Sequence, residues 1–441
     1  MPLAFSGDRL RFLLNRFRDR LWVKPLAVCL LSIAAAFVAK LADGVDVTQM
    51  VPVVAAGSVE SLLSIMAASM LVIATFSVAS MLSAYASAGT TATPRAFSLI
   101  VADDASQNAL STFVGAFIFS VVALTAVQNN YFGPSGLFLL FVLTAVVLAI
   151  VIMTFVLWVD RIARLGRMGS TIDKVEKVAA AAMKRRRNAP TLHGASVGVQ
   201  ERGRAVLTTR VGYVQYIDVA AIQSWAEEAQ VHVEVAALPG TFAAPGRPVA
   251  YVSNGPVDRS EMDDKGLVDS FQIGGDRLFD DDPRFGLIVL SEIAGRALSP
   301  AVNDPGTAID VIGTLLRLFA LWAEPKPVDD EEPPQYDRVA VPEVTLRDMF
   351  DDAFTAIARD GAGMVEVSVR LQKALQSLAS MGNSEMRDAA EYHARLALGR
   401  AELALNMPED LAAVQDAGMF AKPPGPGPGS GAQGATSADR Q

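Results

Sequence analysis

Polar side chains collect in one short stretch between two apolar segments: Ser299, Asn303, Asp304, Thr307 and Asp310. Asp304 followed by Pro305 is a strong helix start, because a carboxylate caps free N–H groups and a proline at the first helical position loses no bond. Polar side chains at a helix N-terminus suit a pocket for a ligand or a contact with a neighbouring subunit. They equally suit a well-capped helix–turn–helix whose polar face is solvated, and the sequence leaves both interpretations open.

A second group lies inside an apolar run. Ser77, Ser80, Ala84 and Ser87 follow one another at spacings of three, four and three, which places them on one helical face. Such a face suits the polar lining of a pathway through a membrane. Small residues and serines also let helices approach closely and bond across in lipid, so close packing is the competing interpretation.

Two polar clusters invite weaker hypotheses. The segment 87–109 carries Arg95, Asp103 and Asp104, and we expect it to be a loop that couples the apolar half of the chain to the polar half. The run Asp280–Asp282 before Pro283 offers carboxylates for a cation but lacks the ligand spacing of a calcium loop. A solvated helix start is the simpler interpretation of that run.

Several kinds of chemistry find no support. The three histidines are far apart, and Cys29 is the only cysteine, so we expect no metal site, no disulfide and no cofactor. Phosphate-binding loops, nucleophile elbows and zinc-protease motifs are missing, and we expect no enzyme. The net charge of -9 argues against nucleic acid as a partner, because phosphate contacts need a basic surface.

The polar groups must be positioned by four apolar runs in the first half of the chain. One of them, Leu137 to Val159, contains no charge, glycine or proline, and it is long enough to cross a bilayer as a helix. The others are Pro25 to Ala42, Leu62 to Tyr85 and Leu110 to Val127. The sequence therefore predicts a four-helix transmembrane domain at 25–160, with the lipid bilayer and other copies of the chain as partners.

Charges predict the orientation of these spans. A basic, amphipathic leader occupies residues 1–24, and Arg161, Arg164 and Arg167 follow the fourth span. The loops on the other side carry no Lys or Arg between the runs. Since cytoplasmic loops are rich in Lys and Arg, we expect both termini to be cytoplasmic, which in a bacterial cell would place the spans in the inner membrane.

After residue 160 the pattern is that of a soluble α+β domain. We expect a membrane-exit helix and basic linker at 161–190, then a cytoplasmic domain at 191–407 with a small β unit followed by a helical half. Alternating strands are predicted near 205–209, 212–217, 231–235 and 249–252, and helices at 219–229, 284–298, 305–323 and within 344–407. An acidic, proline-rich linker is expected at 324–342 and a disordered Pro/Gly tail at 408–441.

Several motifs resemble those of the bacterial predicted membrane proteins grouped as domain-of-unknown-function family 2254. They are Thr93-Pro-Arg-Ala-Phe97, Ser111-Thr-Phe-Val-Gly115, Gly212-Tyr-Val-Gln-Tyr-Ile-Asp218, Pro239-Gly-Thr-Phe242 and Ala297-Leu-Ser-Pro-Ala-Val-Asn-Asp-Pro-Gly-Thr-Ala308. The resemblance implies four spans followed by a soluble C-terminal domain, and it implies no activity or catalytic residue. The Thr-Pro-Arg motif departs from the usual Ser-Pro-Arg but keeps the hydroxyl.

Two functional hypotheses follow. In one, the chain forms a homo-oligomeric pore or transport-related protein regulated by its cytoplasmic domain. In the other, it is a membrane-tethered sensor or scaffold whose cytoplasmic domain binds a ligand or a protein. A membrane enzyme is a third and more distant alternative.

Overall fold

The computed structural model describes residues 23–41, 43, 52, 54–91, 93–101, 104–162, 168–198, 203–253, 263–324 and 333–421. The chain divides into two compact units, an N-terminal unit of Met1–Lys174 and a C-terminal unit of Val175–Gln441. The predicted basic leader lies outside the described residues, except for its last two.

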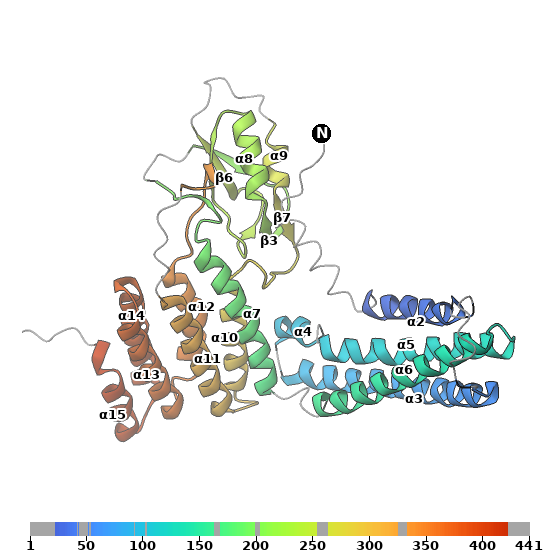
Figure 1. The fold of residues 1–441 in the computed structure, drawn as a ribbon. Coiled ribbons are helices and arrows are strands. Elements are labelled where there is room, and N and C mark those ends of the chain that lie inside the picture. The colour runs from blue at the N-terminus through green and yellow to red at the C-terminus, as the bar shows by residue number, and fades with distance from the viewer. Residues whose placement is uncertain are drawn as a thin grey trace, which may run out of the picture. The chain divides into compact units, whose positions relative to one another are not determined.

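The N-terminal unit is helical. Its elements are α2 (Val23–Leu41), α3 (Ala56–Thr91), α4 (Pro94–Val101), α5 (Asp104–Gln128) and α6 (Pro134–Ile162). Helices α2, α3 and α6 run alongside α5, which has the most extensive contacts and is therefore the centre of the unit (Figure 1). Gly115 makes the approach of α2 to α5 close, because a methyl group there would overlap Val28.

Large apolar side chains divide between the interior and the surface of this unit. Phe113 is fully buried and meets Trp158 edge to face at 6.2 Å. By contrast, Leu157 of α6 is 64% exposed and Leu31 of α2 is 70% exposed. Exposure of this kind is expected where lipid replaces water around a helix.

Among the described residues, five helical segments are long and apolar enough to cross a membrane. They are Val23–Leu41, Ala56–Ala86, Ser106–Gln128, Pro134–Asp160 and Pro305–Ala323. The first four correspond to the four runs predicted from the sequence. The fifth belongs to the C-terminal unit.

The C-terminal unit contains two small sheets. The strands are β1 (Gly194–Ala195), β2 (Arg204–Leu207), β3 (Gly212–Ile217), β4 (His232–Val235), β5 (Phe242–Ala243), β6 (Pro248–Ser253), β7 (Phe271–Gly274) and β8 (Tyr336–Ala340). One sheet has the order β1-β8-β4-β6-β2 and the other the order β5-β3-β7. Helix α8 (Val219–Glu228) packs on β8 and β4, and the short α9 (Lys265–Asp269) packs on α8.

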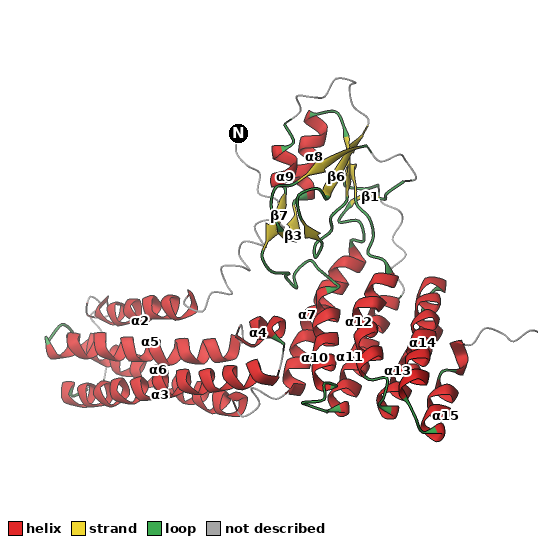
Figure 2. Ribbon diagram, turned by 180° about the vertical axis from the view of Figure 1, so that it is seen from behind, coloured by secondary structure: helices red, strands yellow, loops and turns green. Residues whose placement is uncertain are grey.

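Helices make up the rest of this unit. They are α7 (Met168–Asn188), which begins just before the unit, α10 (Phe285–Ala297), α11 (Pro305–Ala323), α12 (Leu346–Asp360), α13 (Val365–Met381), α14 (Ser384–Ala404), α15 (Pro408–Ala417) and the 3-10 turn η2 (Met419–Ala421). Helices α10 to α14 lie side by side (Figure 2). Helix α11 packs against α10 and α13, and its Phe319 stacks on Phe354 at 5.5 Å.

Three predictions about the chain are wrong in part. The segment 87–109 is not a loop, because α3 continues to Thr91 and α4 and α5 occupy most of the remainder. The predicted linker at 324–342 contains β8, which pairs in parallel with β1 and β4. The predicted disordered tail begins too early, because α15 and η2 pack against α14, whereas residues 422–441 lie outside the described residues.

Candidate functional site

The turn before α11 has the cap geometry that its sequence predicts. Asp304 is the N-cap, and Pro305 follows it. One carboxylate oxygen of Asp304 accepts the Thr307 N–H at 3.1 Å and the other accepts the Thr307 hydroxyl at 2.6 Å. These bonds hold the pKa of Asp304 below its ordinary value. Asn303 has φ of 49°, a left-handed conformation that asparagine tolerates.

The other polar groups of this turn are also used locally. Ser299 donates its hydroxyl to the Arg296 carbonyl at 2.7 Å, and Asp310 is exposed one and a half turns into the helix. The face that continues from Asp310 reaches Arg317, whose guanidinium forms two bonds of 2.7 and 2.6 Å with Glu176 of α7. Local bonds thus occupy the side chains of Ser299, Asp304 and Thr307, whereas Asn303 and Asp310 are exposed, and a ligand role for the group stays a prediction.

The serines of the predicted polar face of α3 differ in how far they are buried. Ser77 is fully buried and donates its hydroxyl to the Ile73 carbonyl of its own helix at 2.8 Å. Ser80 is half-buried, and the Ser87 side chain lies outside the described set. A pathway lined by these serines stays a prediction.

A different face of α3 carries small side chains on its surface. The exposed residues at spacings of three and four are Ser61, Ser64, Ala68, Val72, Thr75, Ala79, Ser83 and Ala86. Only Val72 is larger than threonine. We call this set the small-residue face, and it was not recognised in the sequence because hydroxyls occur on every side of this helix.

The predicted coupling residues are not brought together as one described group. Arg95 is exposed on α4, and Asp104 is the first residue of α5. Asp103 lies outside the described residues. Their coupling role stays a prediction.

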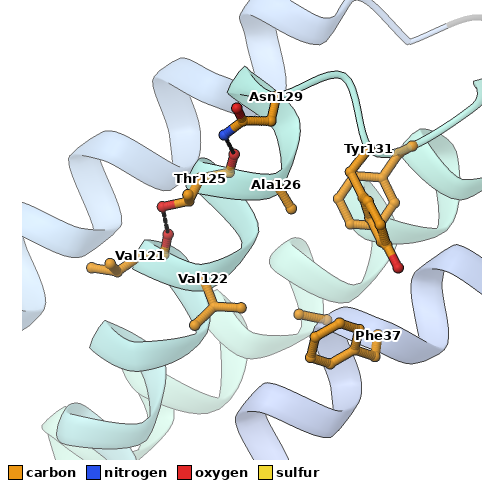
Figure 3. Close-up of a pocket in the computed structure, with 9 residues that line it drawn as sticks. Phe37, Val121, Val122, Thr125, Ala126, Asn129 and Tyr131 are labelled. Carbon is orange, nitrogen blue, oxygen red and sulfur yellow. Dashed lines mark hydrogen bonds between the residues drawn. The ribbon is translucent and has the colours of Figure 1, made fainter.

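A groove of about 360 Å³ lies between α2 and the end of α5 (Figure 3). Phe37, Val121 and Tyr131 form part of its wall. Besides the Tyr131 hydroxyl, its polar side chains are Thr125 and Asn129, and both are bonded within their own segment: Thr125 donates to the Val121 carbonyl at 2.8 Å and Asn129 to the Thr125 carbonyl at 2.7 Å. The groove therefore presents an apolar surface and suits hydrocarbon better than a polar solute.

The carboxylate of Asp43 binds backbone N–H groups at the start of α6. It accepts the N–H groups of Gly133 at 2.7 Å and Gly136 at 2.6 Å, and the ammonium of Lys40 at 3.2 Å. A side chain at Gly136 would collide with this carboxylate and displace it, so glycine lets the carboxylate approach the backbone closely. Although burial raises it, these donors hold the pKa of Asp43 below its ordinary value.

A polar pocket lies in the described part of the C-terminal unit. It has a volume of about 260 Å³ and we call it the arginine pocket. Its walls come from the end of α7, the end of α11, the segment before α12 and the turn between α13 and α14: Arg186, Arg187, Pro190, Trp322, Ala323, Glu324, Glu343, Val344, Leu346, Gly382, Asn383, Glu385 and Met386.

Helical periodicity explains why an arginine is buried here. On α7 the buried residues Val175, Ala179 and Ala182 recur at spacings of four and three, and Arg186 follows four residues later. Close packing of α7 on α10 occurs at Ala179, which leaves no room for a side chain at Gly286. Arg186 is therefore carried into the interior on the apolar face of its helix and is only 3% exposed.

The two guanidinium groups keep unused donors. Arg186 donates from Nη2 to the Pro342 carbonyl at 3.1 Å, but its Nε and Nη1 have no hydrogen-bond partner. Arg187 donates from Nη1 to the Leu321 carbonyl and to Glu324 at 2.9 Å, and its Nε has no partner. A buried donor without an acceptor costs about 1–3 kcal/mol, and more when charged. These groups fit an anionic oxygen from a ligand.

Acidic groups balance this charge. Burial lowers the pKa of Arg186 to about 10, and the fields of Asp281, Glu343 and Asp282 oppose that effect. The guanidinium is therefore charged at neutral pH. Glu343 and Glu385 line the pocket and are exposed, so the mouth is acidic and the interior is basic.

Sequence reasoning missed the arginine pocket. The basic run Lys184 to Arg187 was predicted as the end of the membrane-exit helix, without a buried arginine, although Arg186 continues the apolar spacing of α7. It also missed Asp282, which is 2% exposed rather than solvated and accepts bonds from Arg277 at 2.6 and 2.7 Å. Within the described residues, no group of three or more His, Cys, Asp or Glu side chains is placed to hold a metal ion.

Comparison with known proteins gives a family and uncharacterized relatives. The family model described as "Predicted membrane protein (DUF2254)" matches residues 18–377. Uncharacterized proteins of Mycobacterium tuberculosis strain CDC 1551 and of Mycobacterium bovis are each 30% identical over 128 residues, which is 28% of this chain and 25% of the relative. The match thus spans about a quarter of the length of these curated relatives. No solved structure matches the chain.

Proposed function

The chain belongs to the DUF2254 family of predicted membrane proteins, and we propose that it is a membrane-anchored sensor whose C-terminal unit binds a small ligand in the arginine pocket. One observation carries the proposal: Arg186 is buried, charged and lacks acceptors for its Nε and Nη1 groups. A protein retains such a costly group where a ligand supplies the missing acceptor. The proposed role is binding, without catalysis or a cofactor.

The contrast with the N-terminal unit supports this assignment. Its groove is mainly apolar, and the Thr125 hydroxyl that lines it donates within its own helix. A polar metabolite therefore finds unused charged donors in the arginine pocket, whereas the groove is mainly apolar. The N-terminal unit is the anchor in this proposal.

The anchor is proposed to consist of α2, α3, α5 and α6, with both termini in the cytoplasm of a bacterial cell. Two observations support leaving α11 out of the spans: it packs against α10 and α13, and its Arg317 pairs with Glu176. The basic residues before the first and after the fourth span support the orientation. A reporter fused after Gln441 should be active in the cytoplasm, and a label at Asn129 should react only from outside. Periplasmic activity of the fusion would overturn the orientation.

Ligand binding is tested by the melting temperature of the full-length protein in lipid nanodiscs. The protein is heated with single compounds from a set of small organic acids, phosphates and amines. A compound that occupies the pocket at 100 times its Kd stabilises the folded state by about 2.7 kcal/mol. The upward shift should vanish in Arg186→Gln and persist in Arg370→Gln, an exposed arginine of the same unit. If no compound shifts the wild type, the sensor proposal fails.

A homo-oligomer is the second candidate, because the small-residue face of α3 is exposed. Small residues allow helices to approach closely in lipid. Ala79→Leu should dissociate the oligomer in nanodiscs, whereas Val78→Leu, which lies beside that face, should not. If the oligomer is a pore, Ser80→Leu should stop ion flux in liposomes while assembly persists. Flux that is normal in Ser80→Leu would remove this serine from the pathway.

A further inference from the structure

The arginine pocket has an uneven distribution of charge. Arg186 lies in its interior at 3% exposure, and Arg187 is also largely covered. The carboxylates of Glu343 and Glu385 are exposed at the same pocket. A ligand that enters must therefore pass acidic groups before it reaches the guanidinium donors.

Three glutamates and two arginines line the pocket, so its formal charge is negative even though its unused groups are donors. Glu324 already pairs with Arg187 at 2.9 Å, and Glu385 accepts the Leu346 N–H at 3.3 Å. No bond occupies Glu343 among the contacts that the structure describes, although its field acts on Arg186. A doubly charged anion such as phosphate would meet repulsion from these carboxylates.

A ligand that carries one negative and one positive charge would pair with both Arg186 and Glu343. An acid group would accept the free N–H groups of Arg186, since guanidinium binds carboxylate well. An ammonium group would sit beside the carboxylate of Glu343. The size also points to a small molecule, because a pocket of about 260 Å³ lies below the range of about 300–1,000 Å³ that is typical of sites for drug-sized ligands.

We infer that the arginine pocket takes a small zwitterionic acid, of the amino-carboxylic acid class, with its carboxylate on Arg186 and its ammonium on Glu343. This inference rests on the proposed function as a sensor. It adds the ligand class and assigns one pocket residue to each end of the ligand.

The test is equilibrium binding to the full-length protein in nanodiscs with matched probes. The amino acids are glycine, β-alanine and γ-aminobutyrate, which differ in the separation of their charges. Acetate, propionate and butyrate lack the ammonium, n-butylamine lacks the carboxylate, and inorganic phosphate tests a plain anion. At least one amino acid should bind about fivefold or more tightly than its matched acid, as expected for one added ion pair.

Variants at Glu343 and Arg186 show which residue binds the ammonium end of the ligand and which binds its carboxylate end. Glu343→Gln should remove the preference for the amino acid and leave the matched acid unchanged, and because Glu343 is exposed the fold should tolerate it. Arg186→Gln should weaken both probes by about tenfold or more, since a charged hydrogen bond is lost. Arg186→Lys keeps the charge in case the glutamine variant is unstable, and it should weaken both probes too, because lysine lacks the fork of donors.

The outcomes separate the inference from the proposed function. If an acid and its matched amino acid bind with equal affinity, and both bind more weakly to Arg186→Gln, the zwitterionic ligand class is wrong and the sensor function still stands. Tightest binding of phosphate would do the same. Failure of every probe to bind the wild type would overturn the zwitterion, and the sensor would then depend on the wider compound set alone.

Discussion

The two units satisfy their polar groups in different ways. In the N-terminal unit, Ser77, Ser120 and Thr144 each donate to the carbonyl four residues earlier on the same helix. In the C-terminal unit, Arg317 reaches Glu176, which is 141 residues away. A helix in lipid has to satisfy its polar atoms within itself, whereas the C-terminal unit also uses ion pairs between distant segments, which fix their arrangement.

The largest effect is expected from removing a buried aromatic ring, and it tests whether apolar packing contributes more stability to the C-terminal unit than to the N-terminal unit. Phe354→Ala removes a ring that stacks on Phe319 and should cost the C-terminal unit about 3–5 kcal/mol. Phe113→Ala in the N-terminal unit should cost less, because lipid supplies no hydrophobic driving force between helices. Hydrogen exchange on peptides of each unit measures both. Equal losses would break the comparison.

Buried ion pairs should matter in the C-terminal unit. Arg277→Ala leaves the carboxylate of Asp282 buried without its charge partner and should cost about 3 kcal/mol or more. In the N-terminal unit, Lys40→Ala should cost no more than about 1 kcal/mol, because Asp43 keeps the N–H groups of Gly133 and Gly136. Thermal unfolding of both variants gives the two values. A large loss in Lys40→Ala would show that the N-terminal unit also depends on a charge pair.

Acid should weaken the C-terminal unit first. Burial lowers the pKa of His393 from 6.5 to about 4, more strongly than Asp351 raises it. Between pH 6.5 and 4 the unfolded chain takes up a proton that the folded chain refuses, so stability falls as the pH falls, by up to about 3 kcal/mol. The difference in melting temperature between pH 7 and pH 4.5 should shrink in His393→Gln.

His232 is exposed, so His232→Gln serves as the control for this pH dependence. It should retain the pH dependence of the wild type. Because all three histidines of the chain lie in the C-terminal unit, hydrogen exchange at pH 4.5 should increase there before it increases in the N-terminal unit. Simultaneous loosening of both units would contradict this order.

The smallest effects are expected where polar groups bond locally. Asp304→Ala loses a helix cap at a cost of about 0.5–2 kcal/mol, and Asp304→Ser should be nearly silent in the melting temperature because serine also caps. Ser77→Ala should likewise cost less than about 1 kcal/mol, since its bond stays within α3. If Asp304→Ser abolishes ligand response without changing the melting temperature, the turn is a functional site after all.

The sequence determined the elements whose formation depends on local rules. The apolar runs predicted α2, α3, α5 and α6, because a helix that crosses lipid must be apolar along a whole segment. Helix α11 was predicted with both of its ends, since Asp304 and Pro305 fix its start from within the turn. Alternating residues likewise predicted β3, β4 and β6.

Only the tertiary structure decided the rest. Strand β8 falls in an acidic segment that reads as a linker, and it is a strand because β1 and β4 provide parallel partners. Helical spacing is enough to place Arg186 on the buried face of α7. The arginine pocket, however, is also lined by the end of α11 and by the turn between α13 and α14. Those segments are more than 130 residues further along the chain. Local patterns do not specify such contacts, because they depend on which distant surfaces the fold brings together.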